Sequence, residues 1–328
     1  MLALLNSQKR DVRFASFVSS STLPSVFTKM AIHQASQKQK TSTFRGVCQV
    51  SSRRSEIALK ITKVNPTKSL FCVLIAPVVV LLGASQALAK IQTKDVEYKD
   101  GNTVLEGYLA YDDAISGKRP GVLVVHEWNG LGSYVKRRAE ELAKLGYVAF
   151  AVDMYGKGIR PKNREESAAQ AKIYRSDRQL MRSRANAGLV VLQQNSLTDT
   201  QRIAAIGYCF GGGTVLELAR SGANIAGVVS FHGNLDTPNP NDAKNIKAKV
   251  LVLHGANDPL VPAEQVTAFE TEMRQASVDW QLIAYGGAVH SFTNPEAGND
   301  PSKGIAYNEA ADKRSWAAMK QFFAEIFR

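Results

Sequence analysis

The sequence predicts an α/β domain at residues 90–328, with a mostly parallel central sheet and helices on both of its faces. Two observations predict this class. The stretch begins with a hairpin pattern, and short apolar runs then alternate with amphipathic helical segments along the rest of it. No internal repeat and no linker interrupts the stretch, so we expect one domain.

The first elements form the predicted hairpin. Residues 96–99 and 104–111 are two strand-like segments that flank Asp100-Gly101-Asn102. Such a turn between alternating apolar residues is typical of a β-hairpin. The two segments are therefore expected to pair as antiparallel strands.

The later elements follow two patterns in turn. Short continuous apolar runs indicate strands that are covered on both faces. Apolar residues spaced three and four apart, ended by turn formers such as Gly146, indicate helices. The predicted strands are residues 122–126, 147–153, 202–207, 225–231, 250–254 and 279–284. The predicted helices are residues 133–145, 167–174, 180–194, 211–221, 262–276 and 305–327.

The basic charge of the chain is concentrated before the domain. Residues 1–89 carry 12 lysines and arginines against two acids, Asp11 and Glu56, for a net charge of +10. The remainder carries 29 basic and 27 acidic residues, for a net charge of +2. Nucleic-acid binding needs a basic face on the folded domain, so we expect no nucleic-acid partner.

Residues 1–89 have the composition of a targeting region. Residues 1–68 are rich in Ser, Thr, Lys, Arg and Gln without a sustained period, which predicts disorder or an address sequence. Lys68, the apolar run at residues 70–82 and the small residues that end at Ala89 are typical of a cleavable export signal. The run is shorter than the ~20 residues of a spanning helix. We therefore expect cleavage after Ala89 and no stable membrane insertion of the mature chain, the alternative being a membrane anchor.

Two destinations fit this targeting region. If residues 1–68 are a transit peptide, as their Ser and Arg content favours, the address leads to the plastid thylakoid lumen. Otherwise the apolar run is a bacterial export signal behind an overextended start, and the destination is the periplasm or the extracellular space. Both place the mature chain outside the compartment of its synthesis.

One cysteine lies at a position typical of a nucleophile. The domain holds only Cys209, so it can form no internal disulfide. Cys209 lies in Gly207-Tyr208-Cys209-Phe210-Gly211, between a predicted strand and a predicted helix. Such a turn forces the nucleophile into a strained conformation above the sheet, at a helix N-terminus that favours a thiolate. The amide of Phe210 could bind an oxyanion there. The alternative is a buried core cysteine in a glycine-rich turn.

An acid and a base follow Cys209 in the chain order that such hydrolases use. Asp258 comes after the apolar run 250–254, and His290 lies in a glycine-rich loop after the last predicted strand. Both positions are at carboxyl ends of strands, the edge where open α/β sheets bind ligands. We expect His290 to move the thiol proton and Asp258 to orient the ring. A turn residue before Pro259 is the alternative for Asp258.

The other histidines of the domain are His126, His232 and His254, all near predicted strand ends. We interpret His232 and His254 as hydrogen-bonded structural residues. The three show no ligand spacing of a known metal site, so we expect no metal and no other cofactor.

Four segments together resemble the dienelactone hydrolase family, whose members are carboxymethylenebutenolidase-like enzymes of the α/β-hydrolase fold. They are residues 125–131, 207–212, 257–259 and 289–292, and the likeness extends in the same order over residues 93–327. The resemblance implies a Cys-His-Asp triad at the cysteine, histidine and aspartate already named.

The resemblance also assigns two residues near the first buried strand. It implies that the Glu127 carboxylate contacts the nucleophilic sulfur in the resting enzyme and helps to ready it for substrate. It implies that Trp128 supplies the second oxyanion amide. Dienelactone-specific members carry an arginine that grips the substrate carboxylate shortly after the catalytic histidine, where this sequence has Asn294. Four arginines of the helical segments offer another grip: Arg175, Arg178, Arg182 and Arg184.

The sequence therefore predicts a cysteine-dependent hydrolase that opens an ester or lactone carbonyl through a thioester acyl-enzyme. One alternative is a general carboxylesterase or thioesterase for small acyl substrates. Another is a non-catalytic binding protein on the same fold. The expected partner is a small ester or lactone, and the natural substrate and the oligomeric state stay open.

Overall fold

The computed structural model describes residues 90–328. The predicted targeting region, its apolar run at residues 70–82 and the cleavage site after Ala89 lie outside these residues and stay predictions. Within residues 90–328, no helix combines the length and the apolar character that crossing a membrane requires.

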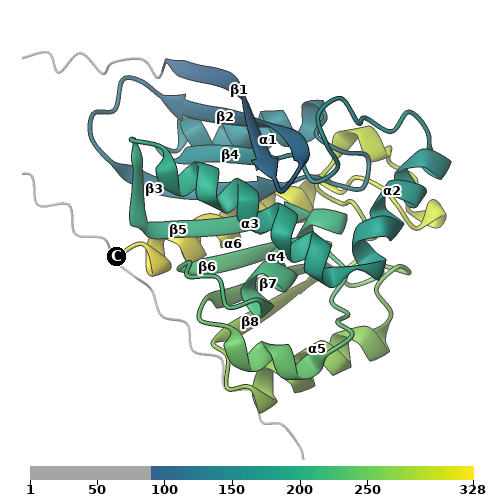
Figure 1. Ribbon diagram of the computed structural model, residues 1–328. Coiled ribbons are helices and arrows are strands. Elements are labelled where there is room, and N and C mark those ends of the chain that lie inside the picture. The colour runs from purple at the N-terminus through teal and green to yellow at the C-terminus, as the bar shows by residue number, and fades with distance from the viewer. Residues whose placement is uncertain (1–89) are drawn as a thin grey trace, which may run out of the picture. The chain divides into compact units, whose positions relative to one another are not determined.

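One eight-stranded sheet, in the order β1-β2-β4-β3-β5-β6-β7-β8, organises the described residues (Figure 1). The first two strands form the predicted hairpin, and β2 pairs antiparallel with β4. The five remaining pairings are all parallel. The predicted α/β class with a mostly parallel sheet is therefore confirmed. The strands are β1 (Ile91–Asp100), β2 (Thr103–Asp112), β3 (Arg119–Val125), β4 (Val148–Val152), β5 (Thr198–Tyr208), β6 (Gly227–Phe231), β7 (Lys249–Gly255) and β8 (Trp280–Tyr285).

Helices cover both faces of the sheet, as the alternating pattern predicts. The α-helices are α1 (Ser133–Lys144), α2 (Arg164–Ser176), α3 (Arg178–Gln194), α4 (Phe210–Arg220), α5 (Ala263–Gln275) and α6 (Glu309–Ile326). Short 3-10 turns lie at Pro240–Asn245, Pro295–Ala297 and Pro301–Lys303. Helices α2 to α5 pack into the apolar layer on one face, whereas α1 and α6 pack into the layer on the other (Figure 1).

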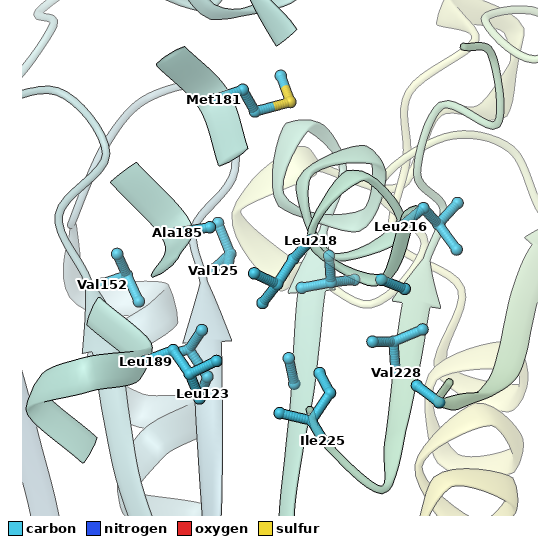
Figure 2. Close-up of a cluster of buried hydrophobic side chains, with 14 of the residues drawn as sticks. Leu123, Val125, Val152, Met181, Ala185, Leu189, Leu216, Leu218, Ile225 and Val228 are labelled. Carbon is cyan, nitrogen blue, oxygen red and sulfur yellow. The ribbon is translucent and has the colours of Figure 1, made fainter. Parts of the chain in front are cut away.

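Strand β3 shows why apolar runs without alternation form these strands. Leu123 and Val125 belong to the layer beneath α3 and α4, whereas Val122 and Val124 belong to the layer beneath α1 and α6. Successive side chains of a strand point to opposite faces, so both faces need apolar residues. Figure 2 shows the first layer, with Leu189 of α3 and Leu218 of α4 among the residues that fill it.

The C-terminal helix begins later than predicted. The expected helix starts at residue 305, but α6 starts at Glu309, after Asn308, whose side chain accepts a hydrogen bond from the Ala311 amide. The four residues before α6 extend past the loop after β8, where Ile305 forms a parallel bridge with His290. A backbone pairing outside the apolar periodicity thus overrides the helical pattern.

Candidate active site

The turn around Cys209 has the strained geometry that the glycine pattern predicts. Cys209 lies between the end of β5 and the start of α4, with φ 53° and ψ −115°. A Cβ atom on Gly207 would lie 2.0 Å from the Gly211 carbonyl oxygen, and one on Gly211 would lie 2.3 Å from the carbonyl oxygen of Val125. Only glycine fits at either position, so both glycines permit the close crossing of strand and helix.

Three side chains from separate loops meet at this turn. The Cys209 sulfur lies 3.0 Å from His290 Nε2, and His290 Nδ1 lies 2.8 Å from an Asp258 carboxylate oxygen. All three residues are buried. The three follow strands β5, β7 and β8, so the carboxyl edge of the sheet brings them together.

The charge state of this cluster follows from its contacts. Burial alone would lower the pKa of His290, but the negative charge of the Cys209 sulfur and the hydrogen bond to Asp258 raise it to about 10. A histidine with this pKa is protonated at neutral pH. The contacts therefore favour an imidazolium between the Cys209 sulfur and the Asp258 carboxylate.

Backbone contacts hold His290 and Asp258 in place. The His290 amide donates to the Gly304 carbonyl at 3.2 Å, and the His290 carbonyl accepts from the Ala306 amide at 3.1 Å. An Asp258 oxygen accepts from the Leu260 amide at 2.8 Å, which leaves the other oxygen for the imidazole. The segment before α6 thus fixes the histidine instead of extending the helix.

The Glu127 carboxylate lies in the same cleft but has other partners than the resemblance implies. Asn294 Nδ2 donates to one oxygen at 2.6 Å, and Ser291 Oγ donates to the other at 3.1 Å. No hydrogen bond within residues 90–328 joins this carboxylate to the sulfur of Cys209, so the implied resting contact is not found there. Burial raises the pKa of Glu127, although both hydrogen bonds oppose the shift.

Two backbone amides near the sulfur are unused. The amides of Phe210 and Trp128 donate to no group within residues 90–328. Phe210 is the first residue of α4, where a helix leaves its amides without internal partners. Trp128 lines the cleft together with Cys209. Both amides therefore lack a partner among the described residues, and their role in binding an oxyanion stays a prediction.

Two of the remaining histidines form hydrogen bonds with the backbone of site residues. Burial lowers the pKa of His232 well below its usual value, and His232 Nδ1 accepts a hydrogen bond from the Cys209 amide at 3.1 Å. The other ring nitrogen of His232 lies 2.7 Å from the Thr293 hydroxyl. His126 is fully buried and hydrogen-bonded through both nitrogens. His254 is buried but does not line the cleft.

No metal ligand set is found in the part of the chain that the structure describes. Within residues 90–328, no three His, Cys, Asp or Glu side chains are arranged to hold a metal ion. The expectation that the chain needs no cofactor stays a prediction.

The family of the chain follows from comparison with known proteins. The model of the dienelactone hydrolase family matches residues 105–327, the whole region that holds the three strand-end loops. The chain belongs to the dienelactone hydrolase family. It is therefore a hydrolase of that family with an α/β-hydrolase fold.

Three relatives illustrate the range of likeness within and around the dienelactone hydrolase family. The crystal structure of a dienelactone hydrolase-like promiscuous phosphotriesterase from metagenomic libraries is 43% identical, with a TM-score of 0.70, over 73% of this chain and 99% of that chain. A Bradyrhizobium sp protein named "Probable 2-oxo-3-(5-oxofuran-2-ylidene)propanoate lactonase" is 27% identical over 61% of this chain and 85% of that protein. The dienelactone hydrolase from Anabaena variabilis is 22% identical, with a TM-score of 0.53, over 73% of this chain and 99% of that chain, a likeness of fold.

The cleft of this dienelactone hydrolase family member has three cationic residues at its rim and two acids, Glu127 and Glu296, in its lining. Its volume is about 660 Å³, and Arg164, Arg175 and Lys303 line it along with the Cys209 sulfur. Arg175 also donates to the Asn234 side chain, and Arg164 lies over the Trp128 ring. Of the arginines suggested by the sequence, only Arg175 reaches the cleft.

The other three suggested arginines form ion pairs away from the cleft. Arg178 pairs with Asp236, and Arg184 pairs with Asp100. Arg182 pairs with the buried Glu217 and with Asp242. Sequence reasoning missed Arg164 and Lys303, since neither follows a strand. It also missed Ser291 and Asn294 as partners of Glu127, although both lie within four residues of His290.

Proposed function

We propose that this hydrolase cleaves the carbonyl of an ester or lactone with the Cys209 sulfur as nucleophile, through a thioester acyl-enzyme. The observation that carries the proposal is the continuous hydrogen-bonded chain from the sulfur through His290 to Asp258, at 3.0 and 2.8 Å. The left-handed backbone at the sulfur supports it, because strain of this kind clusters at functional sites.

The reaction follows from the contacts. The thiolate of Cys209 attacks the carbonyl carbon, and the carbonyl oxygen becomes an oxyanion that the amides of Phe210 and Trp128 bind. The carbon–oxygen bond to the leaving alkoxide breaks, and His290 Nε2 gives it a proton. Water then loses a proton to His290 and attacks the thioester, which releases the acid and restores the thiolate. Asp258 stabilises the imidazolium at both stages.

Glu127 supports these reaction steps by holding neighbouring residues in place and not by contact with the sulfur. Its carboxylate ties the residues after His290 to the residues after β3 through Ser291 and Asn294. We infer that these hydrogen bonds fix the backbone on the two sides of the bound carbonyl.

The substrate class follows from the rim of the cleft. Arg164, Arg175 and Lys303 favour an ester or lactone that also carries a carboxylate. With Asn294 in the place of an arginine, the grip on that carboxylate must come from α2 and from the segment before α6. A general carboxylesterase or thioesterase would instead prefer uncharged acyl groups, and a non-catalytic binding protein would turn over none.

A substrate panel tests the proposal. Wild type, Cys209→Ala and Cys209→Ser are each assayed on carboxylated enol lactones, neutral p-nitrophenyl esters, acyl thioesters and a p-nitrophenyl phosphate triester. We expect the carboxylated lactones to have the highest kcat/KM and the alanine variant to lose at least about 10⁴-fold in kcat. Equal hydrolysis by the alanine variant would remove Cys209 from the mechanism. Preference for neutral esters would identify the general esterase, and preference for the phosphate triester would assign another reaction.

We also propose that the enzyme is exported after cleavage following Ala89. The support is the basic, acid-poor composition of residues 1–68 and the short apolar run at residues 70–82. N-terminal sequencing of the mature protein from its native source tests this. A first residue at Lys90 agrees with the proposal, and a mature chain that retains the apolar run contradicts it.

A further inference from the structure

The peptide bond between Glu127 and Trp128 carries one of the two amides assigned to the oxyanion. A trans peptide is planar, and its carbonyl and amide point in opposite directions. Whatever fixes the Glu127 carbonyl therefore also aims the Trp128 amide. Two donors hold this carbonyl: the Gly130 amide at 3.2 Å, which closes a turn, and His126 Nδ1.

The hydrogen-bond partners of His126 determine where its proton lies. Its Nε2 accepts a hydrogen bond from the Met154 amide at 3.3 Å, so that nitrogen carries no proton. The proton of the neutral ring is therefore on Nδ1, which donates to the Glu127 carbonyl. Burial lowers the pKa of His126 to about 4, which keeps the ring neutral at physiological pH. The arrangement thus provides one fixed donor and one fixed acceptor.

We propose that His126 is a positioning residue for the oxyanion site, which acts by holding and polarising the Glu127–Trp128 peptide. The Nδ1–H donor draws electron density toward the carbonyl oxygen, and this makes the Trp128 amide on the other side of the same peptide a stronger donor. The inference rests on the proposed function, because it assigns the Trp128 amide to the oxyanion.

The packing around His126 connects the two oxyanion residues. The His126 ring stacks against the Phe210 ring at a centroid distance of 6.0 Å and 22°. It also makes an edge contact with the Tyr155 ring at 4.8 Å. The Tyr155 hydroxyl donates to the Trp128 carbonyl at 2.8 Å. One buried ring thus contacts the side chain of one oxyanion residue, the preceding peptide of the other and the tyrosine that fixes its carbonyl.

Two variants distinguish the effect of the Nδ1–H donor from the effect of the volume of the ring. His126→Leu fills similar space without a donor or an acceptor. His126→Asn retains an N–H near the Nδ1 position and loses the contact with Met154. Tyr98→Phe is the matched control, since it removes a partly buried hydroxyl that binds the Asp153 backbone beside Met154 and leaves the Glu127 carbonyl untouched.

Three measurements are made on the full-length protein. The first is kcat and KM for an ester that the wild type hydrolyses. The second is the rate at which iodoacetamide alkylates Cys209, a displacement that needs the thiolate but forms no oxyanion. The third is the affinity for a small trifluoromethyl ketone, measured as protection from alkylation. The sulfur adds to the ketone carbon and the ketone oxygen becomes an oxyanion, so this affinity reports the oxyanion site without turnover.

We expect His126→Leu to lower kcat and the ketone affinity by about 10- to 100-fold, with KM and the alkylation rate near those of wild type. His126→Asn restores most of both losses, and Tyr98→Phe changes neither. Equal ketone affinity in wild type and His126→Leu would overturn the inference, as would a parallel loss of the alkylation rate. Failure of the proposed function is a separate result, because it appears as hydrolysis that survives in Cys209→Ala.

Discussion

The two ends of helix α4 each hold a buried polar cluster, but the clusters differ in how completely their groups are paired. At the N-terminal end, Cys209 has a left-handed backbone, and the amides of Phe210 and Trp128 have no partner within residues 90–328. At the C-terminal end, the guanidinium of Arg220 donates from all three of its nitrogens to buried acceptors.

The C-terminal cluster satisfies every charge that it buries. Arg220 binds Glu272 at 2.8 Å and Glu217 at 3.0 Å, and its remaining donor reaches the Leu235 carbonyl at 3.1 Å. Arg182 supplies a second cation to Glu217. The comparison shows that burial of charge alone does not mark a reactive site. Backbone strain and unpaired hydrogen-bond donors beside the charge do mark a reactive site, because both destabilise the fold unless a ligand binds there.

The largest expected effect belongs to the N-terminal cluster. Asp258→Asn should lower kcat by about 10⁴-fold, because the asparagine amide favours the wrong tautomer of the His290 ring and no longer stabilises the imidazolium. The melting temperature should change little, since the side chain still accepts the Leu260 amide. Steady-state kinetics and a thermal melt on the same preparation check this. A rate within tenfold of wild type would exclude Asp258 from the mechanism.

The C-terminal cluster should give the opposite result. Arg220→Ala should lower the free energy of unfolding by about 3–5 kcal/mol, because it leaves buried carboxylates without their cation. The folded fraction should retain the wild-type kcat/KM. Urea unfolding monitored by circular dichroism and active-site titration measure the two quantities. The double variant Arg220→Met with Glu272→Met is the control, and it should recover a large part of the loss. A fall in kcat/KM of the folded enzyme would mean that the two ends are coupled.

The pH dependence of the rate should also distinguish the N-terminal cluster. Because the pKa of His290 is raised to about 10, the imidazolium should persist well above neutral pH. We expect kcat/KM to stay level from neutral pH to about 9 and to fall as the pH rises through about 10, where the general acid is lost. A pH profile of kcat/KM, corrected for hydrolysis of the substrate by hydroxide alone, measures this dependence. A fall near the ordinary histidine value of 6.5 would contradict the ion pair.

The smallest expected effect concerns Glu127, the buried carboxylate of the cleft. Its folded pKa is raised by burial above the usual 4.5, so the charged form destabilises the fold as the pH rises through the folded pKa. Glu127→Gln should therefore be more stable than wild type at neutral pH, and the difference should shrink below pH 4.5. Thermal melts between pH 4 and 8 measure it. An unchanged difference over that range would show that ionisation of Glu127 is not involved.

Much of the fold and the central cluster could be predicted from the sequence, because both depend on local patterns. Apolar runs and helical spacing predict the strand order along the chain, and in a parallel sheet all carboxyl ends meet at one edge. This places Cys209, Asp258 and His290 together before any coordinate is known. The strand and helix cross so closely that only glycine fits at positions 207 and 211, and these glycines are visible in the sequence itself.

The features of the site that could not be predicted depend on the three-dimensional path of irregular segments. Ser291 and Asn294 bind Glu127 because the loop after β8 turns back over β3, and no periodicity describes that path. Residues 305–308 carry a helical pattern but pair with the His290 loop, a long-range contact that overrides local preference. Arg164 reaches the cleft only because α2 lies over it, so its role could not be predicted from its position in the chain.

The residue that carries the acyl group during turnover can be identified by mass spectrometry. An activated ester is mixed with the enzyme, the reaction is quenched in acid within the burst, and the digested protein is mapped by mass spectrometry. We predict one acyl group, carried as a thioester on the peptide that contains Cys209, with none in Cys209→Ala. An acyl group on Ser291, or steady hydrolysis with no acylated peptide, would contradict it.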